Sequence, residues 1–250
     1  MHKANYITSP NMNELTHGFF TKSGGVSKGI YESLNCGISS KDVKKNIITN
    51  RKIVSYSLGF NHNDLLIANQ THSNKVKIVN KIEDNINCDA MIYLSNKITL
   101  GVLTADCCPI LVAHKKKYII GVIHLGWKGL YKGIIENFLN KVKSLKIQAS
   151  DLLLALGPCI GPKSFEVDVV FKNKFIKNNN KAQSFFFTVD NKIFFDIRAY
   201  AKHILIKLGC TNIWVSKHDT YEQNNVFFSY RYSKHNNFLD YGRLLSVIKN

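Results

Sequence analysis

The chain lacks any long hydrophobic run. A membrane span requires about 18 consecutive apolar residues, and every uninterrupted apolar stretch of this chain is much shorter. The first six residues, Met1 to Tyr6, carry charge without a following apolar core, so they lack the pattern of a secretory signal. These two absences predict a cytoplasmic protein. The content of 45% hydrophobic and 20% charged residues over 250 positions is ordinary for a globular protein.

Arginine and acidic residues are scarce. There are 4 Arg beside 30 Lys, and 17 acidic residues leave a formal net charge of +17. Such a charge permits binding to nucleic-acid phosphates. Arginine, however, is better suited than lysine to make paired hydrogen bonds to bases and phosphates, and no nucleic-acid motif accompanies the lysines. We therefore interpret the scattered lysines as a solvated surface that also attracts anionic small molecules. A non-enzymatic nucleic-acid binder is the alternative, which tight binding at raised salt without catalysis would favour.

Regular cysteine and histidine spacings are also absent. The six cysteines form no C-x-x-C pair, and a long chain without a signal peptide is not the context of a disulfide scaffold. The nine histidines include no His-x-His pair of the kind that multicopper oxidases use, so copper-dependent phenol oxidation is not favoured. Most of the cysteines are predicted to be small buried hydrophobes, with Cys107 as the exception.

Internal repeats, low-complexity tracts and linkers are missing, so we expect one domain over residues 1–250. Apolar residues at helical spacing predict helices at 40–58 (ended by Gly59), Gly129–Lys143 and Phe194–Leu208. Short apolar runs predict strands at Leu65–Ala68, Val76–Val79, Ile98–Leu103, Leu152–Leu156, Ile213–Val215 and Val226–Phe228. Strand pairs mixed with separate helices favour an α+β fold, with mixed β-sheets flanked by helices, over a regular βαβ wind.

A predicted β-hairpin carries the most informative residues. Its strands are Ile110–His114 and Tyr118–Ile123, and the polar turn Lys115–Lys117 joins them. In an antiparallel pair, the numbers of two residues that lie opposite each other add up to a constant. If Ala113 or His114 faces Tyr118, that sum is about 231 to 232, which brings Cys107 near His124. A thiolate and an imidazole from opposite strands can bind a metal or form a nucleophile–base pair.

A third residue, His72, has a similar position. His72, Cys107 and His124 each lie where a predicted strand gives way to a loop, and such positions often carry function. Two imidazoles and one thiolate suit Zn²⁺ and leave one tetrahedral position open, as in catalytic zinc sites. Periodicity does not place His72 beside the other two. The residues therefore leave open a zinc-dependent enzyme and a metal-free hydrolase with Cys107 as nucleophile and His124 as base.

Several short strings, in one order along the chain, resemble those of a known family. They are Gln70-Thr71-His72, Cys88-Asp89-Ala90, Leu103 to Leu111, His124 to Gly129, Gly157 to Pro162, Phe165-Glu166-Val167 and Phe227 to Arg231. Together they closely resemble the laccase-domain, or polyphenol oxidase, family, now regarded as purine nucleoside phosphorylases. One branch of that family is named a peptidoglycan editing factor. The match runs from about Gly18 to Arg243, which is nearly the whole chain.

This resemblance implies a metal site on His72, Cys107 and His124, with Zn²⁺ favoured over copper. It implies phosphorolysis of adenosine, inosine and 5′-methylthioadenosine to the base and (methylthio)ribose 1-phosphate, together with adenosine deamination. The small-molecule partners are then purine nucleosides and phosphate. It also implies a compact mixed fold related to cysteine-hydrolase toxins. A metal-free Cys–His hydrolase acting in peptidoglycan precursor editing is the alternative role, and the sequence leaves the oligomeric state open.

The chemistry implied by the resemblance requires particular side chains. For deamination, a bound metal activates water near neutral pH for attack on the purine carbon that bears the amine. Phosphorolysis needs an anion-binding region, for which Arg51 and Lys128 are candidates because both lie in family-like strings. Asn35 and Asp106 are candidates for orienting the substrate or a ligand, although short polar side chains also cap turns.

The chain departs from the family pattern at a few positions. Lys128 and Tyr232 stand where the family usually has arginine, Leu125 replaces a small residue, and Asp219-Thr220 replaces Cys-Thr. The three proposed metal ligands are unaffected. The arginine replacements bear on phosphate binding, since a lysine is a point charge whereas an arginine forks two oxygens.

Overall fold

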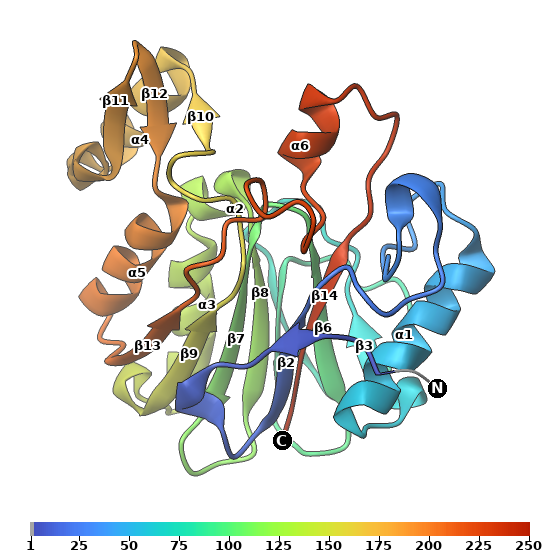
Figure 1. Ribbon diagram of the computed structural model, residues 1–250. Helices are drawn as coiled ribbons and strands as arrows, with labels where there is room; N and C mark the ends of the chain where they lie inside the picture. Colours follow the sequence, from blue (N-terminus) through green and yellow to red (C-terminus); the bar gives the residue numbers. More distant parts are fainter. Residues whose placement is uncertain (1–2) are drawn as a thin grey trace.

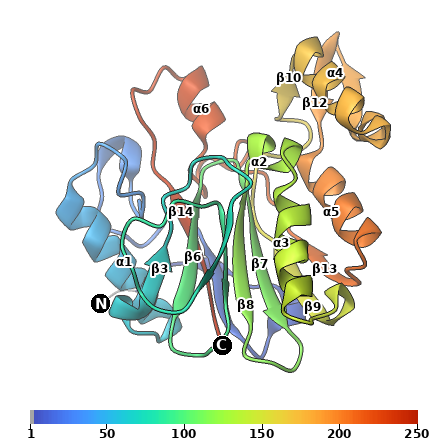
Figure 2. The same ribbon diagram turned by 180° about the vertical axis from the view of Figure 1, so that it is seen from behind.

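Two large β-sheets pack face to face in the computed structural model, which describes residues 3–250 (Figures 1 and 2). The six-stranded sheet contains β13 (Asn212–Val215), β9 (Leu152–Leu156), β7 (Cys108–His114), β8 (Ile120–Leu125), β5 (Ala90–Tyr93) and β4 (Val76–Val79), in that order. The five-stranded sheet contains β1 (Tyr6–Ile7), β2 (Thr16–Phe20), β14 (Leu244–Lys249), β6 (Thr99–Thr104) and β3 (Leu65–Ile67).

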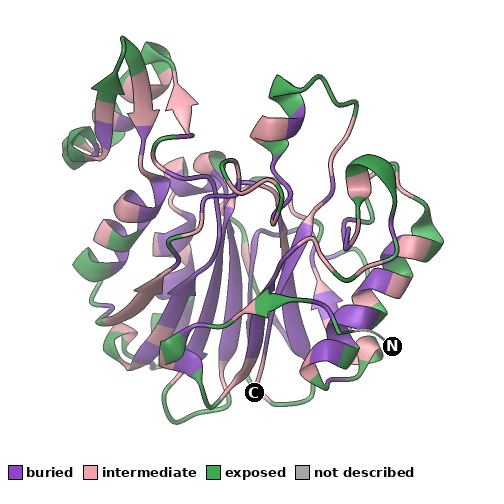
Figure 3. Cartoon of the chain, in the orientation of Figure 1, coloured by how far each residue is buried: buried purple, intermediate pink, exposed green. Residues whose placement is uncertain are grey.

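The sheets form the two inner layers of a four-layer structure because successive strand residues point to opposite faces. In β7, Leu111 and Ala113 pack toward the five-stranded sheet, whereas Ile110 and Val112 pack against helices. These helices are α3 (Ile134–Ser144) and α5 (Ile197–Lys207), and α1 (Lys44–Leu58) covers the outer face of the five-stranded sheet. Figure 3 shows the resulting pattern, with buried strands at the centre and exposed helix faces outside.

Smaller elements stand above one end of the two sheets (Figure 1). A three-stranded sheet projects beside α5, and α6 rises over the same end. The elements are α2 (Trp127–Tyr131), α4 (Val169–Asn178), α6 (Tyr230–His235), β10 (Glu166–Val167), β11 (Phe186–Val189) and β12 (Lys192–Phe195). The short 3₁₀ helices are η1 (Pro10–Met12), η2 (Gly29–Tyr31), η3 (His62–Asp64), η4 (Ala149–Asp151) and η5 (Asn180–Phe185).

The predicted α+β class is confirmed, as are most of the predicted elements. Helix α1 ends at Leu58 and is followed by Gly59, whose φ of 73° is the left-handed conformation typical of a glycine that follows a helix. The predicted strands at Val76–Val79 and Leu152–Leu156 are β4 and β9. Within residues 3–250, no helix is long and apolar enough to cross a membrane.

Each of the three predicted helices had a wrong boundary. The helix expected at 40–58 begins only at Lys44. The expected helix at Gly129–Lys143 is divided into α2 and α3, because Gly133 adopts a φ of 79° that interrupts the helix. The expected helix at Phe194–Leu208 begins only at Ile197. Phe194 and Phe195 belong to β12, and the Asp196 side chain caps α5 by accepting a hydrogen bond from the backbone N–H of Ala199.

The predicted strand at Val226–Phe228 was wrong. The backbone N–H groups of Val226 and Phe227 both donate to the carbonyl of Gln223, which makes a turn. Phe227 and Phe228 are buried against Leu244, so their apolar character reflects packing and not membership of a sheet.

The central hairpin forms as predicted, but its register was wrong. Tyr118 lies in the turn, which is longer than expected, and the second strand begins at Ile120. Pro109 therefore lies opposite His124, and Cys108 lies opposite Leu125. Cys107 precedes the first strand and follows Asp106, whose φ is 81°.

Candidate functional site

Three predicted ligands, His72, Cys107 and His124, come together at one end of the sheets. Their donor atoms all lie within 4.8 Å of one another, and Cys107 Sγ is 4.0 Å from His72 Nε2. His72 follows β3, Cys107 lies between β6 and β7, and His124 lies in β8. His124 is buried, Cys107 is half-buried and His72 is exposed, so the cluster opens to solvent on one side. Within residues 3–250, this is the one group of at least three such side chains close enough to share an ion.

The buried carboxylate of Asp89 holds two of these histidines in place. One oxygen, Oδ1, lies 2.8 Å from His124 Nδ1 and accepts a hydrogen bond from the backbone N–H of His72. The other oxygen accepts hydrogen bonds from the backbone N–H groups and hydroxyls of Thr71 and Ser73. Because Asp89 binds Nδ1 of His124, that ring presents Nε2 to the cluster. Metal-binding histidines commonly have such a carboxylate partner.

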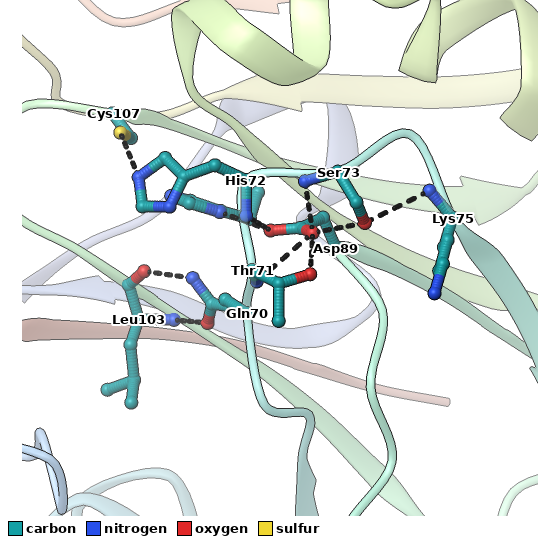
Figure 4. A network of polar contacts seen from close by, with 9 residues as sticks. Gln70, Thr71, His72, Ser73, Lys75, Asp89, Leu103 and Cys107 are labelled. Carbon is teal, nitrogen blue, oxygen red and sulfur yellow. Dashed lines mark hydrogen bonds and ion pairs between the residues drawn. The ribbon is translucent and has the colours of Figure 1, made fainter.

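The loop that carries His72 is fixed at several points (Figure 4). His72 has a φ of 55°, a left-handed conformation that costs an ordinary residue about 1–2 kcal/mol. The bonds from Thr71, His72 and Ser73 to Asp89 offset that cost. Just before them, the Gln70 side chain exchanges two hydrogen bonds with the backbone of Leu103 at the end of β6. The loop is therefore joined to both large sheets.

The charges of the cluster reinforce one another. Burial alone would raise the pKa of the Cys107 thiol, but the charge of His124 and the contact with His72 lower that pKa to about 7. Burial would lower the pKa of His124, but the charge of Cys107 and the bond to Asp89 raise it to about 9. Burial would raise the pKa of Asp89, but hydrogen bonds from His124 and Ser73 hold it well below its usual range. The cluster thus favours a thiolate, the form in which cysteine binds metals and attacks substrates.

The donor set fits a single metal ion. Cysteine sulfur and histidine nitrogen are the usual zinc donors, and three protein ligands leave a fourth position for substrate, as in catalytic zinc sites. A tetrahedral zinc ion would hold a sulfur and a nitrogen donor roughly 3.5 Å apart. The 4.0 Å between Cys107 and His72 is close to that separation.

Gly126 borders the cluster, and its replacement by alanine is expected to disturb metal binding. A Cβ at Gly126 would lie 3.1 Å from Cys107 Sγ and 3.0 Å from His72 Cδ2. The backbone of Gly126 (φ −84°, ψ 161°) suits any residue, so strain arises only from that crowding. We expect G126A to lower zinc affinity by about 10-fold, the smaller effect typical of displaced metal-site geometry. Competition with a fluorescent chelator measures it.

Stability provides the control for this variant. The thermal unfolding midpoint of metal-free G126A should stay close to that of the metal-free wild type. Unchanged zinc affinity would contradict the placement of Gly126 against both ligands.

Two hollows adjoin the cluster. The first, called here the arginine hollow, has a volume of 410 Å³ and includes Arg51 and Arg243 in its lining. The second, called the aromatic hollow, has a volume of 360 Å³ and includes Trp127, Phe165 and Tyr230. Both volumes fall in the lower part of the range for small-molecule sites, which is about 300–1,000 Å³. His72, Ala105, Cys107 and Tyr241 line both hollows, so the hollows meet at the cluster.

The composition of the arginine hollow suits an anion, because its lining contains two arginines and no carboxylate. Arg51 donates through Nε to the carbonyl of Cys36, and the Arg243 guanidinium lies 4.3 Å from the centre of the Tyr241 ring. In the part of the chain that is described, neither arginine makes an ion pair. Two arginines without anionic partners in one hollow are suited to bind phosphate.

The remaining predicted candidates lie in different places. Lys128 lines the aromatic hollow, with its Nζ 5.6 Å from the centre of the Trp127 ring, so it does not share a hollow with Arg51. Asn35 is fully buried outside both hollows, and its Oδ1 accepts a hydrogen bond from the backbone N–H of Arg243. Its contact with the site is therefore indirect.

Asp106 is also occupied by structural bonds. It accepts hydrogen bonds from the backbone N–H of Arg231 and the hydroxyl of Thr220. Burial raises the pKa of this carboxyl. Asp106 borders the aromatic hollow and shapes the turn that presents Cys107, which agrees with the turn-forming alternative.

Sequence reasoning did not assign roles to Asp89, Arg243 or Tyr241. Asp89 lies in one of the family-like strings, which was a usable signal for its importance. Arg243 had a weaker signal, the scarcity of arginine itself. Three of the four arginines line one of the two hollows, namely Arg51, Arg231 and Arg243.

Comparisons with known proteins agree with the resemblance found in the sequence. A protein of Haemophilus influenzae named purine nucleoside phosphorylase is 32% identical, over 96% of this chain and 97% of that protein. Purine nucleoside phosphorylase YfiH of Escherichia coli is 31% identical, over 86% of this chain and 87% of that protein.

Solved structures show the same fold. A Neisseria meningitidis protein matches with a TM-score of 0.84 and 28% identity, over 100% of this chain and 98% of that one. The hypothetical protein YfiH of Bacillus licheniformis matches with a TM-score of 0.87 and 26% identity, over 95% and 93% of the two chains. Residues 16–250 match the family described as multi-copper polyphenol oxidoreductase laccase, and the chain therefore belongs to that family.

Proposed function

We propose that this protein is a zinc-dependent purine nucleoside phosphorylase that also deaminates adenosine. The observation that carries the proposal is the convergence of His72, Cys107 and His124 at the junction of an anion-binding and an aromatic hollow. The names of the relatives in Haemophilus influenzae and Escherichia coli support the nucleoside assignment. The proposed substrates are adenosine, inosine and 5′-methylthioadenosine with phosphate.

Two reactions are assigned to the site. In phosphorolysis, a phosphate oxygen forms a bond to C1′ of the ribose while the C1′–N9 bond breaks. The base leaves with the electron pair and takes up a proton. In deamination, water replaces the amino group at C6 of adenosine, which gives inosine and ammonia. A group that binds phosphate and a group that activates oxygen therefore have to lie near one nucleoside.

The residues of the site divide this work. Arg51 and Arg243 bind and orient phosphate in the arginine hollow. His72, Cys107 and His124 hold the ion, and Asp89 keeps His124 in the orientation that presents Nε2. When bound, Zn²⁺ supplies a Lewis acid that polarises oxygen near neutral pH. We favour zinc over copper because three S/N donors with one open position match catalytic zinc sites.

Incubation with adenosine, with and without phosphate, tests the function. With phosphate we expect ribose 1-phosphate in an amount equal to adenine plus hypoxanthine, because inosine formed by deamination is also cleaved. Without phosphate we expect inosine and ammonia only. Chromatography separates the nucleosides and bases, and metal analysis of the same sample gives the zinc content. Absence of all of these products in zinc-loaded protein would overturn the proposal.

Replacement of Arg51 by methionine is expected to raise the KM for phosphate by about 10-fold or more, because hydrogen bonds to charged groups contribute about 1.5–3 kcal/mol. Initial rates at varied phosphate measure this effect. Lys117→Met is the matched control, since Lys117 is an exposed cation in the β7–β8 turn. A KM for phosphate that is the same in R51M and wild type would contradict the phosphate assignment of the arginine hollow.

A metal-free Cys–His hydrolase is the second candidate, with peptidoglycan precursors as its proposed substrates. Cys107 would be its nucleophile and His124 its base, and Asp89, 2.8 Å from His124 Nδ1, would be the carboxylate that orients the base. Full activity after complete chelation of zinc would favour this candidate. Loss of activity with the chelator, restored by added zinc, would exclude it.

A further inference from the structure

We propose that the aromatic hollow binds the purine base, and that Tyr241 forms the wall between the base and the phosphate and contributes to base recognition. This inference rests on the proposed function and adds to it a location for each half of the substrate. The evidence is the different lining of the two hollows and the position of Tyr241 in both.

The lining of the aromatic hollow suits a neutral planar ring. Trp127, Phe165, Tyr230 and Tyr241 supply aromatic surface, and Ile160 adds an apolar side chain. Nucleobases stack on aromatic side chains, and such contacts tolerate different bases because every base has a π-face. This tolerance agrees with a site that accepts both adenine and hypoxanthine.

The one arginine of the aromatic hollow is already engaged. Arg231 donates through both terminal nitrogens to the carbonyl of Glu166, and its guanidinium lies 5.7 Å from the centre of the Phe165 ring. Lys128 lies over the face of Trp127. In the other hollow, Arg51 donates only through Nε to Cys36, and Arg243 donates through one terminal nitrogen to the carbonyl of Tyr241. Each therefore keeps a terminal nitrogen for an anion, so phosphate belongs there and the base belongs here.

The reaction itself demands such a division. Phosphate that attacks C1′ opposite the departing base approaches from the other side of the ribose. The two hollows meet at His72, Ala105, Cys107 and Tyr241, which places the ribose beside the metal cluster. Tyr241 is then the aromatic residue adjacent to both the base and the attacking phosphate.

The fold holds Tyr241 firmly. Its ring packs edge to face against Tyr230 at 5.1 Å and carries the Arg243 guanidinium at 4.3 Å. The neighbouring Asp240 accepts hydrogen bonds from the Tyr31 hydroxyl at 2.8 Å and the backbone N–H of Lys41 at 2.7 Å. The segment between α6 and β14 is therefore tied to the N-terminal part of the chain on the side of Tyr241.

Adenine binding in phosphate-free buffer tests the inference. The chain has two tryptophans, and Trp214 lies in β13 against Phe19, away from the site. In a W214F background, Trp127 alone reports the aromatic hollow. We expect adenine to change the Trp127 fluorescence, and Tyr241→Leu to weaken adenine binding by about 10-fold, the scale of one lost stacking contact.

Three controls make this result specific. Y241F keeps the ring and should bind adenine like the parent protein. Tyr118→Leu removes an exposed tyrosine from the β7–β8 turn, where 67% of the residue is accessible, and should have no effect. The KM for adenosine in Y241L should rise by about the factor lost in adenine binding. Y241F keeps the ring on which Arg243 stacks, so its KM for phosphate should change less than about twofold.

The outcomes separate this inference from the proposed function. If the wild type cleaves adenosine but Y241L binds adenine as tightly as the parent, the base assignment is overturned and the function stands. The same holds if adenine neither inhibits the wild type nor changes the Trp127 signal. If the wild type cleaves no nucleoside, the proposed function fails first, and the inference fails with it.

Discussion

Replacing Cys107 with alanine is expected to abolish zinc binding and to lower both phosphorolysis and deamination by about 10³-fold or more. Cys107 contributes the only anionic donor of the cluster, and two neutral imidazoles hold a divalent ion far less tightly. A bound ion stabilises the transition state by several kcal/mol, and each loss of about 1.36 kcal/mol of that stabilisation lowers the rate tenfold. Zinc content by mass spectrometry and rates with saturating adenosine and phosphate measure the two effects.

The adjacent Cys108 gives a matched control. Its side chain is fully buried and points into the core beside Gly157, so C108A removes a thiol one residue away without touching the cluster. C108A should keep its zinc and most of its activity, although it will lose some stability. Wild-type turnover in C107A would remove the proposed centre, whatever the family of the chain.

The hairpin shows what a single sequence can predict. Strands β7 and β8 are continuous apolar runs with a lysine-rich turn between them, so the local pattern was enough to predict both strands. Their local pairing brought Cys107 and His124 together within one or two residues of the true register. The error arose at the turn, where Tyr118 is exposed and does not begin the second strand. Turn conformation depends on backbone geometry that apolar patterning does not encode.

His72 shows where prediction from spacing ends. It reaches the cluster only because Asp89, 17 positions away, binds its backbone, and because Gln70 joins its loop to Leu103, 33 positions from Gln70. Contacts of that kind depend on which strands are neighbours in the sheets, and hydrophobic periodicity along the sequence does not predict this. For this residue the family-like string Gln70-Thr71-His72 carried the prediction.

The arginine hollow depends on still longer separations. Arg243 and Asn35 are 208 positions apart, and both chain ends have to enter the five-stranded sheet before they meet. The phenylalanine-rich β11–β12 hairpin was missed for a different reason. Each strand has only one buried residue, and Phe195 packs against aromatic residues of α4 and α5 instead of the space between the two large sheets.

Replacing Asp89 with asparagine is expected to lower zinc affinity and activity by about 10- to 100-fold, the range typical of a lost partner to a metal ligand. Hydrogen-bond donors surround both oxygens of this carboxylate. The amide that replaces it in D89N has one oxygen, so its NH₂ group has to face some of those donors. If the NH₂ faces His124, Nδ1 must accept a hydrogen bond from it. The ring then carries its own proton on Nε2, which blocks the donor atom that points to the cluster.

If the NH₂ of the substituted amide faces Ser73 instead, the buried N–H and hydroxyl there lose their acceptor, which costs about 1–3 kcal/mol of stability. Both orientations are harmful, so D89N should combine weaker zinc binding with a lower unfolding free energy. Asp168→Asn is the matched control, because Asp168 caps α4, belongs to neither the cluster nor the two hollows, and asparagine caps a helix equally well. Zinc affinity, urea unfolding and adenosine turnover of both variants give the comparison, and wild-type values in D89N would show that His124 does not need its carboxylate partner.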